Sequence, residues 1–326
     1  MKALTAFLLF SLCILPGFVQ SQTFSRQAVL EDFETLQQSL NDAHYQVDVY
    51  TPQSTLDSLY RVIRSEIQAD SFTFLETTNL FQRYIGAIQN GHTEIDFPVS
   101  SYMEYAMGGG TIFPLEIAIE DGKALIRKNW SGQESILPGM QLLSIDGVEI
   151  NQVLAEIYPQ IPGERLYFKQ AKLEFFSFPR YAWQVFGEQE TFRVKILAQG
   201  TIKPYTLKAV PVIEGFELKR DEILNAQQRI EFLPEAAYLN PGDLSGDEPT
   251  FQAFIDSAFT EIKKQQAKNL IIDLRNNRGG NNSFSDYLVA YIADQPFRWN
   301  DRFTLKTSAF LKTFVRENYD TTDVYW

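Results

Sequence analysis

The segment Asn269–Gly280, NLIIDLRNNRGG, constrains the fold of this chain more than any other stretch. Its apolar run, Leu270–Ile272, is bounded by polar residues, which is typical of a strand buried on both faces. The paired glycines Gly279 and Gly280 let backbone N–H groups approach a ligand, because no Cβ stands in the way. Ser283, with an acid three residues later, predicts the N-cap of a helix. The segment therefore predicts a strand, a glycine turn and a helix in succession.

Two interpretations of this arrangement stay open on the pattern alone. Glycine amides and a helix N-terminus together favour negative charge at one point, which indicates an anion or oxyanion site. The same residues also make a well-formed turn in an α/β core that carries no chemistry.

The letters DLRNNRGG, residues 273–280, resemble the signature of tail-specific (C-terminal processing) serine peptidases and their tricorn-like relatives. The resemblance implies that the final glycine, Gly280, supplies an oxyanion-hole amide and that Gly279 belongs to the same loop. The family usually has a third glycine where this chain has Arg278, a difference that leaves the oxyanion position intact.

The first 21 residues differ in character from the rest of the chain. Lys2 is followed by a mostly apolar run, the breaker Pro16 and small residues at the cleavage spacing, which predicts a cleavable signal peptide over residues 1–21. A membrane anchor needs about 20 apolar residues, more than Pro16 permits. Lipid attachment at Cys13 is not expected, because the bulky Leu12 precedes it. The prediction is export to the periplasm or the exterior without a stable membrane anchor.

Charge and cysteine content restrict the function classes further. The net charge of −12 argues against nucleic acid and anionic membranes as partners, and removal of the signal makes it one unit more negative. The signal also holds the only cysteine, so the stability of the mature chain must come from packing. A length of 326 residues favours about two domains.

Residues 22–107 are predicted to form an N-terminal helical region. Apolar side chains recur at helical spacing in three windows, Val29–Leu40, Leu56–Ile67 and Phe81–Ile88. Thr73 and Glu76 form a capping-box pattern at the start of the third helix, which is expected to end at Asn90-Gly91.

Residues 108–213 are predicted to form a β-rich module with a partly helical insertion, because the apolar period changes to two. Residues 139–150, GMQLLSIDGVEI, resemble the central segment of PDZ domains. PDZ-like domains capture peptide C-termini by adding a strand to a sheet edge. The resemblance makes Gly108, Gly109 and Gly110 candidates for the loop that holds the peptide carboxylate, although a connector between domains explains three glycines equally well.

Residues 214–326 have an α/β pattern, in which an amphipathic helix over 251–262 lies between short strands. A helix between strands indicates a crossover and a largely parallel sheet. The expected fold is therefore α/β with several domains: the helical region, the PDZ-like module and a partial peptidase core.

His92 is the candidate general base. It follows the third predicted helix, where a histidine also serves simply to satisfy helix carbonyls and the helix dipole. Tricorn-like peptidases carry a Gly-His-Thr-type motif at such a place, so the resemblance implies that His92 accepts the proton of a serine. Imidazole suits this role because its pKa lies near operating pH. Asn90 stands where the family motif commonly has an acid, which leaves the orienting carboxylate unassigned.

The other histidine, His44, is expected to pack or to cap the first helix. The two histidines are far apart, and the mature chain has no cysteine, so the spacing predicts neither a metal nor another cofactor.

No convincing nucleophile is predicted. In the family the catalytic serine follows the diglycine motif on a later strand-to-helix turn, and the segment from Gly280 to Trp326 lacks that pattern. Ser308 is the nearest imitation, but it lacks the apolar strand and the glycine turn. The expectation is a truncated peptidase, inactive alone as the 326-residue chain, for which a Ser-His and a Ser-Lys mechanism both stay open.

The leading hypothesis is an exported serine-type peptidase that hydrolyses proteins or peptides through an acyl-enzyme and engages its substrate by the C-terminus. The alternative is a non-catalytic periplasmic peptide-binding protein that uses the PDZ-like module. The sequence does not predict an oligomeric state.

Overall fold

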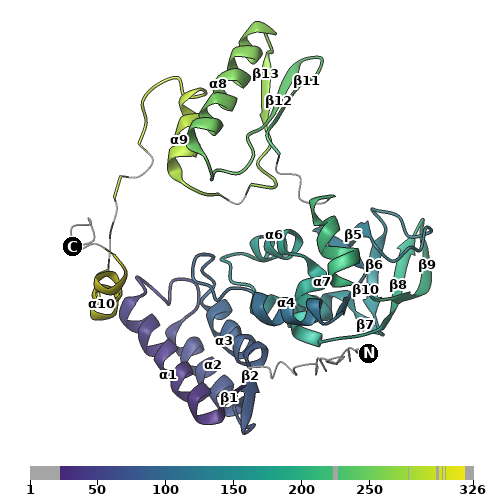
Figure 1. Ribbon diagram of the computed structural model, residues 1–326, viewed down its shortest axis with the longest axis vertical. Helices are drawn as coiled ribbons and strands as arrows, with labels where there is room; N and C mark the ends of the chain where they lie inside the picture. The colour runs from purple at the N-terminus through teal and green to yellow at the C-terminus, as the bar shows by residue number, and fades with distance from the viewer. Residues whose placement is uncertain are drawn as a thin grey trace, which may run out of the picture.

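The computed structural model describes residues 23–222, 227–277, 279–298, 301–302, 304 and 306–319. The predicted signal peptide, Cys13 and Arg278 lie outside the described residues. Figure 1 shows a helical region, a β-rich unit beside it, and a smaller α/β unit above both. Both ends of the smaller unit lead back to the rest of the chain (Figure 1).

The helical region contains the three predicted helices and one more, α4. Its elements are β1 (Thr23–Ser25), α1 (Arg26–Ala43), α2 (Gln53–Glu66), β2 (Ser71–Thr73), α3 (Phe74–Ile88) and α4 (Val99–Met107). Strands β1 and β2 pair antiparallel, which fastens the start of α1 to the start of α3. None of the helices in the described parts of the chain is long and apolar enough to cross a membrane.

An aromatic core holds α1, α2 and α3 together. Phe33 of α1 is fully buried and stacks on Tyr60 and Phe81, with ring centroids 4.9 and 5.2 Å away. The predicted capping box is confirmed, because Thr73 Oγ1 accepts from Glu76 N and the Glu76 carboxylate accepts from Thr73 N. The first turn of α3 therefore has its exposed amides satisfied.

The β-rich unit is a six-stranded antiparallel sheet with helices packed on it. Its strands are β3 (Thr111–Ile112), β4 (Leu115–Glu120), β5 (Lys123–Asn129), β6 (Gln141–Ile145), β7 (Val148–Glu149), β8 (Thr191–Ala198), β9 (Thr201–Lys208) and β10 (Val210–Pro211). The sheet runs β4-β5-β6-β8-β9 with β7 on β6, and β3 pairs separately with β10. Asp121 and Gly122 both have positive φ, as do Asp146 and Gly147, and the flanking strands pair antiparallel, so two-residue hairpin turns lie at both places.

Most helices of this unit lie in the insertion between β7 and β8, residues 150–190. They are α5 (Ile150–Ile157), η1 (Tyr158–Gln160), α6 (Leu166–Phe176), α7 (Phe178–Phe186), the π-helical turn η2 (Val212–Phe216) and η3 (Glu217–Glu222). Leu173 of α6 and Phe178 of α7 are fully buried in the same core as Leu142 of β6. The insertion therefore belongs to the core of the sheet unit.

A buried ion pair fastens η3 to the β-rich unit. Arg220 of η3 lies 3.0 Å from Glu116 of β4, and it also donates to the carbonyl of Phe175 at 2.7 Å. Burial raises the pKa of Glu116 to about 7, although the nearby Arg220 opposes this shift. The contact fixes the last element that precedes the α/β unit.

The α/β unit consists of β11 (Arg229–Phe232), β12 (Ala236–Asn240), α8 (Glu248–Lys264), β13 (Asn269–Ile272) and α9 (Asn282–Ala290). Strands β12 and β13 run parallel with α8 as their crossover, whereas β11 and β12 are antiparallel. The predicted largely parallel sheet is therefore only partly right for this unit, because one of its two described strand pairings is parallel and the other is antiparallel. The turn over 233–235 is too short for a crossover, which takes a dozen or more residues.

The α/β unit has its own hydrophobic core. Leu239, Phe251, Ile255 and Phe284 are buried together between the sheet and the two helices. Within the described residues, the hydrogen bonds of 229–298 stay inside that range. The carboxyl ends of β12 and β13 point toward the rest of the molecule (Figure 1).

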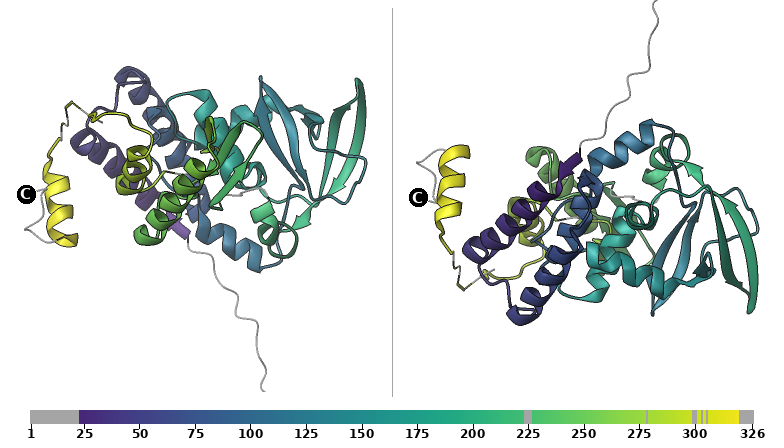
Figure 2. Two further views of the ribbon diagram at one scale, coloured as in Figure 1. Left: turned by 90° about the horizontal axis from the view of Figure 1, so that it is seen from above. Right: turned by 90° about the horizontal axis from the view of Figure 1, so that it is seen from below.

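The last described helix, α10 (Ala309–Asn318), packs on α1, opposite the six-stranded sheet (Figures 1 and 2). Lys306 Nζ donates to the carbonyls of Asn41 and His44 at 3.0 and 2.9 Å. A cation at these carbonyls suits the negative end of the α1 dipole.

Candidate functional site

Asp273 organises the turn that follows β13. Its carboxylate accepts from the backbone N of Arg275 at 3.0 Å and from the Arg275 guanidinium at 2.9 and 2.7 Å. The Tyr238 hydroxyl of β12 donates to the same carboxylate. The Arg275 guanidinium, aided by Tyr238, holds the pKa of Asp273 well below its usual range. Asp273 is thus ionised at neutral pH, which fixes the entry into the glycine loop.

Asn277 joins the loops that follow β12 and β13, and Asn240 stabilises the first of these loops. Asn277 Nδ2 donates to Gly242 O at 2.7 Å, and Asn277 Oδ1 accepts from Gly279 N at 2.8 Å. Asn240 Oδ1 accepts from Gly242 N at 3.0 Å. Because the two strands are parallel, both loops meet at one edge of the sheet, where ligands commonly bind in α/β folds.

Gly280 occupies a position that only glycine can fill. Its φ is 148°, and a Cβ there would lie 1.9 Å from the carbonyl oxygen of Leu244. Gly280 forms a parallel bridge with Leu244, in which Asn281 N donates to Leu244 O at 2.9 Å. Gly280 is an exposed residue, and because the bridge uses the amide of Asn281, the N–H of Gly280 itself is directed away from Leu244. An amide in this arrangement can donate to a ligand oxygen.

Helix α9 begins immediately after this amide. Its N-cap is Asn281, whose Oδ1 accepts from Ser283 N at 3.0 Å, so the predicted Ser283 cap is wrong. Asn281 supplies the capping oxygen earlier, and the Ser283 hydroxyl instead donates to Glu248 at 3.1 Å. The helix N-terminus therefore lies beside Gly280, as the sequence predicts, with its start two residues earlier.

His92 is exposed on a clamped loop that follows α3. The Asn90 side chain accepts from His92 N at 2.9 Å, and the Asn90 carbonyl accepts from Thr93 N at 3.1 Å. The buried Gly91 N–H donates to Glu164 Oε1 at 2.8 Å. The backbone around the imidazole is thus fixed on both sides, whereas the ring itself is accessible.

His44 lies at the C-cap of α1, one of its two expected places, and also supports the His92 loop. Its Nδ1 accepts from Gln46 N at 3.2 Å, so the neutral ring donates from Nε2 to Thr93 Oγ1 at 2.8 Å. Burial, followed by the charge of Lys306, lowers the pKa of His44 and favours this neutral form.

His92 and Gly280 lie on different units of the fold. The His92 loop is bonded to the α5–α6 connection and to α1, whereas the Gly280 loop is bonded to β12 and its following loop. The edge that carries Gly280 is directed toward the part of the molecule that contains α3 and α6 (Figure 1). The structure therefore orients the two loops toward one region without a bond between them among the described residues.

Ser308, the weak nucleophile candidate, acts as the N-cap of α10. Its Oγ accepts from Leu311 N at 3.0 Å, and the residue is only 7% exposed. A buried hydroxyl engaged in a helix cap is poorly placed to attack a substrate.

The candidate carboxylate loop Gly108–Gly110 forms the end of α4 in this conformation. The three amides donate to the carbonyls of Glu104, Ala106 and Tyr105 at 3.0, 3.1 and 2.9 Å. The Tyr105 hydroxyl also bonds both the N and the O of Thr111. Capture of a carboxylate here would require these amides to change partners.

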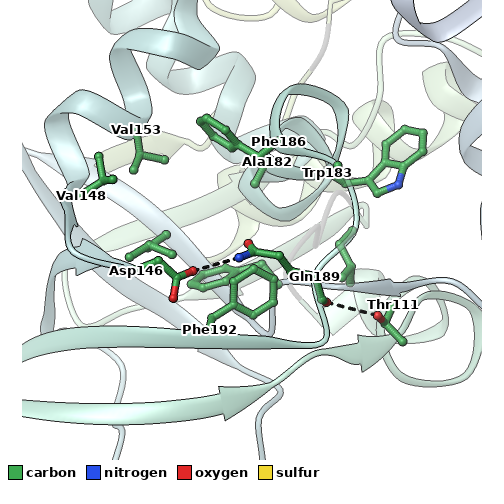
Figure 3. Close-up of a pocket in the computed structure, with 13 residues that line it drawn as sticks. Thr111, Asp146, Val148, Val153, Ala182, Trp183, Phe186, Gln189 and Phe192 are labelled. Carbon is green, nitrogen blue, oxygen red and sulfur yellow. Dashed lines mark hydrogen bonds between the residues drawn. The ribbon is translucent and has the colours of Figure 1, made fainter.

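A cavity of about 310 Å³ lies beside β3, and three of the residues that line it, Ile145, Asp146 and Val148, belong to the segment 139–150 (Figure 3). It is lined by Thr111, Ile112, Phe113, Ile145, Asp146, Val148, Val153, Ala182, Trp183, Phe186, Gly187, Gln189 and Phe192. Its rim is polar, because Gln189 donates to Asp146 at 3.1 Å and Thr111 to the Gln189 carbonyl at 3.5 Å. Apolar walls with a few polar groups suit an organic side chain or a small ligand.

No group of three or more histidine, cysteine, aspartate or glutamate side chains in the described parts of the chain could hold a metal ion.

Comparison with known families and structures places these loops in context. Residues 238–298, which include both glycines of the motif, match the model of peptidase family S41. The match covers β12, α8, β13 and α9. A search of curated protein sequences found no match.

Three solved structures share the fold. Mature CPAF has a TM-score of 0.53 at 15% identity over 78% of this chain and 56% of its own. A point mutant of CPAF gives 0.52 at 15% over 78% and 57%, and CPAF complexed with lactacystin gives 0.51 at 13% over 81% and 59%. The chain thus spans less than two thirds of these proteins. The family match and the shared fold mark it as similar to S41 peptidases.

Proposed function

We propose that this chain carries the oxyanion loop and the general base of an exported serine-type peptidase, which hydrolyses proteins or peptides through an acyl-enzyme. The S41 match over residues 238–298 and the CPAF-like fold support a peptidase. The tail-specific or tricorn-like branch, the PDZ-like nature of the β-rich unit and the signal over residues 1–21 are further parts of the proposal.

The observation that carries the proposal is the conformation of Gly280. Its N–H is directed away from the Leu244 bridge, on an exposed residue at the edge where the β12 and β13 loops meet beside the N-terminus of α9. A preorganised amide that donates to a developing oxyanion is worth about 2.7–4 kcal/mol in other hydrolases. The helix dipole of α9 adds to this preference for negative charge.

His92 is assigned the transfer of protons. A serine hydroxyl attacks the substrate carbonyl carbon, His92 takes the hydroxyl proton, and the Gly280 amide donates to the resulting oxyanion. His92 then protonates the leaving amine as the peptide C–N bond breaks, and water releases the acyl group in a second round. For this chemistry the α/β unit has to close onto the His92 loop.

We infer that the attacking serine is absent from this chain, because no serine after Gly280 follows the strand-to-helix pattern of the family, and Ser283 and Ser308 are engaged in structural hydrogen bonds. A fluorophosphonate probe tests this directly on the purified chain without residues 1–21. The expected result is no labelled serine. Labelling of any serine would show that the nucleophile is present.

The peptidase assignment is tested with the product of the whole gene, including any reading frame that continues after Trp326. Hydrolysis of unfolded casein is expected to fall at least 100-fold in His92→Gln, as for removal of other general bases. Because His92 is exposed, the melting temperature should not change. Casein hydrolysis that persists within twofold in this variant would refute the assignment.

Export is tested by expression with the native N-terminus. Protein recovered from the periplasm or the medium is expected to begin at Gln22, as read by N-terminal sequencing. Recovery of the intact chain in the cytoplasm alone would contradict the proposed signal.

A second candidate function is peptide binding without catalysis through the β-rich unit. The cavity beside Thr111–Phe113 favours it, since it offers an apolar pocket next to a sheet edge. A library of peptides with free C-termini should then show enrichment that Ala182→Phe, which fills the pocket, removes. A library without enrichment would count against this function.

A further inference from the structure

Two side chains distant in sequence bind the loop that presents His92: Glu164, just before α6, and Lys172 of α6. Gly91 N–H donates to Glu164 Oε1 at 2.8 Å, and the Gly91 carbonyl accepts from Lys172 Nζ of α6 at 3.5 Å. A Cβ on Gly91 would lie 2.6 Å from the Phe168 ring and 3.2 Å from Glu164 Oε2. The Glu164 carboxylate is therefore packed directly against the residue that precedes the imidazole.

The two charged side chains that bind Gly91 differ in whether an opposite charge offsets them. Lys172 forms an ion pair with Glu94, which offsets its positive charge. Glu164 is held ionised, because the Gly91 amide, and more weakly the charges of His92 and Lys172, lower its pKa. The carboxylate thus places a negative charge against the residue that immediately precedes His92.

We propose that Glu164 is the carboxylate that positions His92. The peptidases that this chain resembles commonly have an acid at the position of Asn90, and Glu164 takes over the role of that acid here. It orients the loop through the Gly91 amide and presents a negative charge to the imidazolium that forms when His92 takes the serine proton. This inference rests on the proposed peptidase function for its purpose, but its geometry can be tested without activity.

Two roles of Glu164 can be separated by one substitution. Glu164→Gln keeps an oxygen that accepts from Gly91 N–H and removes the negative charge. If Glu164 only holds the loop through the Gly91 amide, the Glu164→Gln variant should behave like the parent. If its negative charge acts on His92, the variant should lose that effect. Glu164→Asp keeps the charge and serves as the rescue variant, and Glu134→Gln makes the same charge change at an exposed site.

The first experiment is an NMR titration of the labelled chain without residues 1–21, from pH 7 to pH 2.5. The Gly91 amide proton and the His92 ring protons are both expected to shift at the pH where Glu164 gains its proton, below its ordinary value of 4.5. Both inflections should vanish in Glu164→Gln and remain in Glu134→Gln. An inflection at Gly91 without one at His92 would overturn the positioning role, and no inflection at either would overturn the contact itself.

The second experiment measures casein hydrolysis by the product of the whole gene. Glu164→Gln is expected to lower kcat about tenfold with KM within twofold, less than for a buried triad acid because Glu164 is solvated. Glu164→Asp should recover at least a third of the activity. An unchanged kcat would overturn the inference. If the parent protein hydrolyses nothing, the proposed function fails, and the NMR titration still decides whether Glu164 acts on His92.

Discussion

The buried pair of Glu116 and Arg220 allows a sharp test of how η3 is held. We consider Arg220→Met, which keeps the aliphatic bulk, removes the ion pair at 3.0 Å and removes the bond to the Phe175 carbonyl at 2.7 Å. Both side chains are at least 90% buried, so solvent does not replace the lost partner. The Glu116 carboxyl then has to take a proton in order to remain inside the fold.

The size of the effect depends on pH. The pKa of Glu116 is raised from 4.5 to about 7 in the folded chain, so the folded state binds a proton more tightly than the unfolded state. The contribution of the protonated Glu116 to the free energy of unfolding is fully present below pH 4.5. It falls by about 1.4 kcal/mol per pH unit as the pH rises to 7. Above pH 7 the wild type loses no more, because the ionised Glu116 is paired with Arg220.

The variant has no such partner, so its loss continues above pH 7 at about 1.4 kcal/mol per unit. The free energy of unfolding should therefore fall below that of the wild type by an amount that reaches roughly 3 kcal/mol at pH 9 from this source. The lost bond to Phe175 adds about 1.5–3 kcal/mol at every pH. The total of roughly 4.5–6 kcal/mol at pH 9 overlaps the upper part of the 3–5 kcal/mol that breaking a buried pair typically costs.

The assay is urea unfolding at pH 6, 7, 8 and 9, followed by tryptophan fluorescence. Trp130 reports on this region, since its ring contacts Phe216 just before η3. The double variant Glu116→Leu with Arg220→Met should be more stable than the single variant and show little dependence on pH above 7. A difference between Arg220→Met and wild type that is the same at pH 6 and pH 9 would refute the reasoning.

Three other predictions concern packing and turns. Phe33→Ala should lower the free energy of unfolding by about 3–5 kcal/mol in urea, since Phe33 is fully buried between two rings, and a loss below about 1 kcal/mol would contradict this core. Thr73→Ala should cost about 1 kcal/mol by thermal unfolding, and an unchanged melting temperature would argue against the capping box. Gly280→Ala should break the bond from Asn281 N to Leu244 O, because its Cβ would overlap that oxygen, so faster hydrogen exchange at Asn281 is expected and unaltered exchange would be evidence against the loop geometry.

Local sequence patterns predicted the local structure well. The helical periods around Phe33 and Ile63 and the capping box at Thr73 depend on neighbouring residues alone. The same holds for the strand and turn before Gly280. Propensity and turn chemistry act over a few residues, so a single sequence can reveal them.

The predictions that were wrong or missing depend on contacts between residues distant in sequence, or on competition between neighbouring residues for the same role. The parallel sheet was overestimated because the 233–235 turn makes β11 and β12 a hairpin. Asn281 outcompetes Ser283 for the cap, because either side chain suits that role. No pattern could show that Glu164 lies against Gly91 or that β3, β6, β7, α5, α7 and β8 together enclose a cavity, because both follow from tertiary packing.

The central claim is that the Gly280 loop and the His92 loop act on one substrate. The mature chain would have no cysteine, so Asp96→Cys with Asn282→Cys gives two unique exposed sites for spin labels, one beside each loop. Pulsed electron spin resonance then measures the distance between the labels with and without unfolded casein. The account predicts that casein increases a population of short distances, and a single long distance that casein leaves unchanged would contradict it.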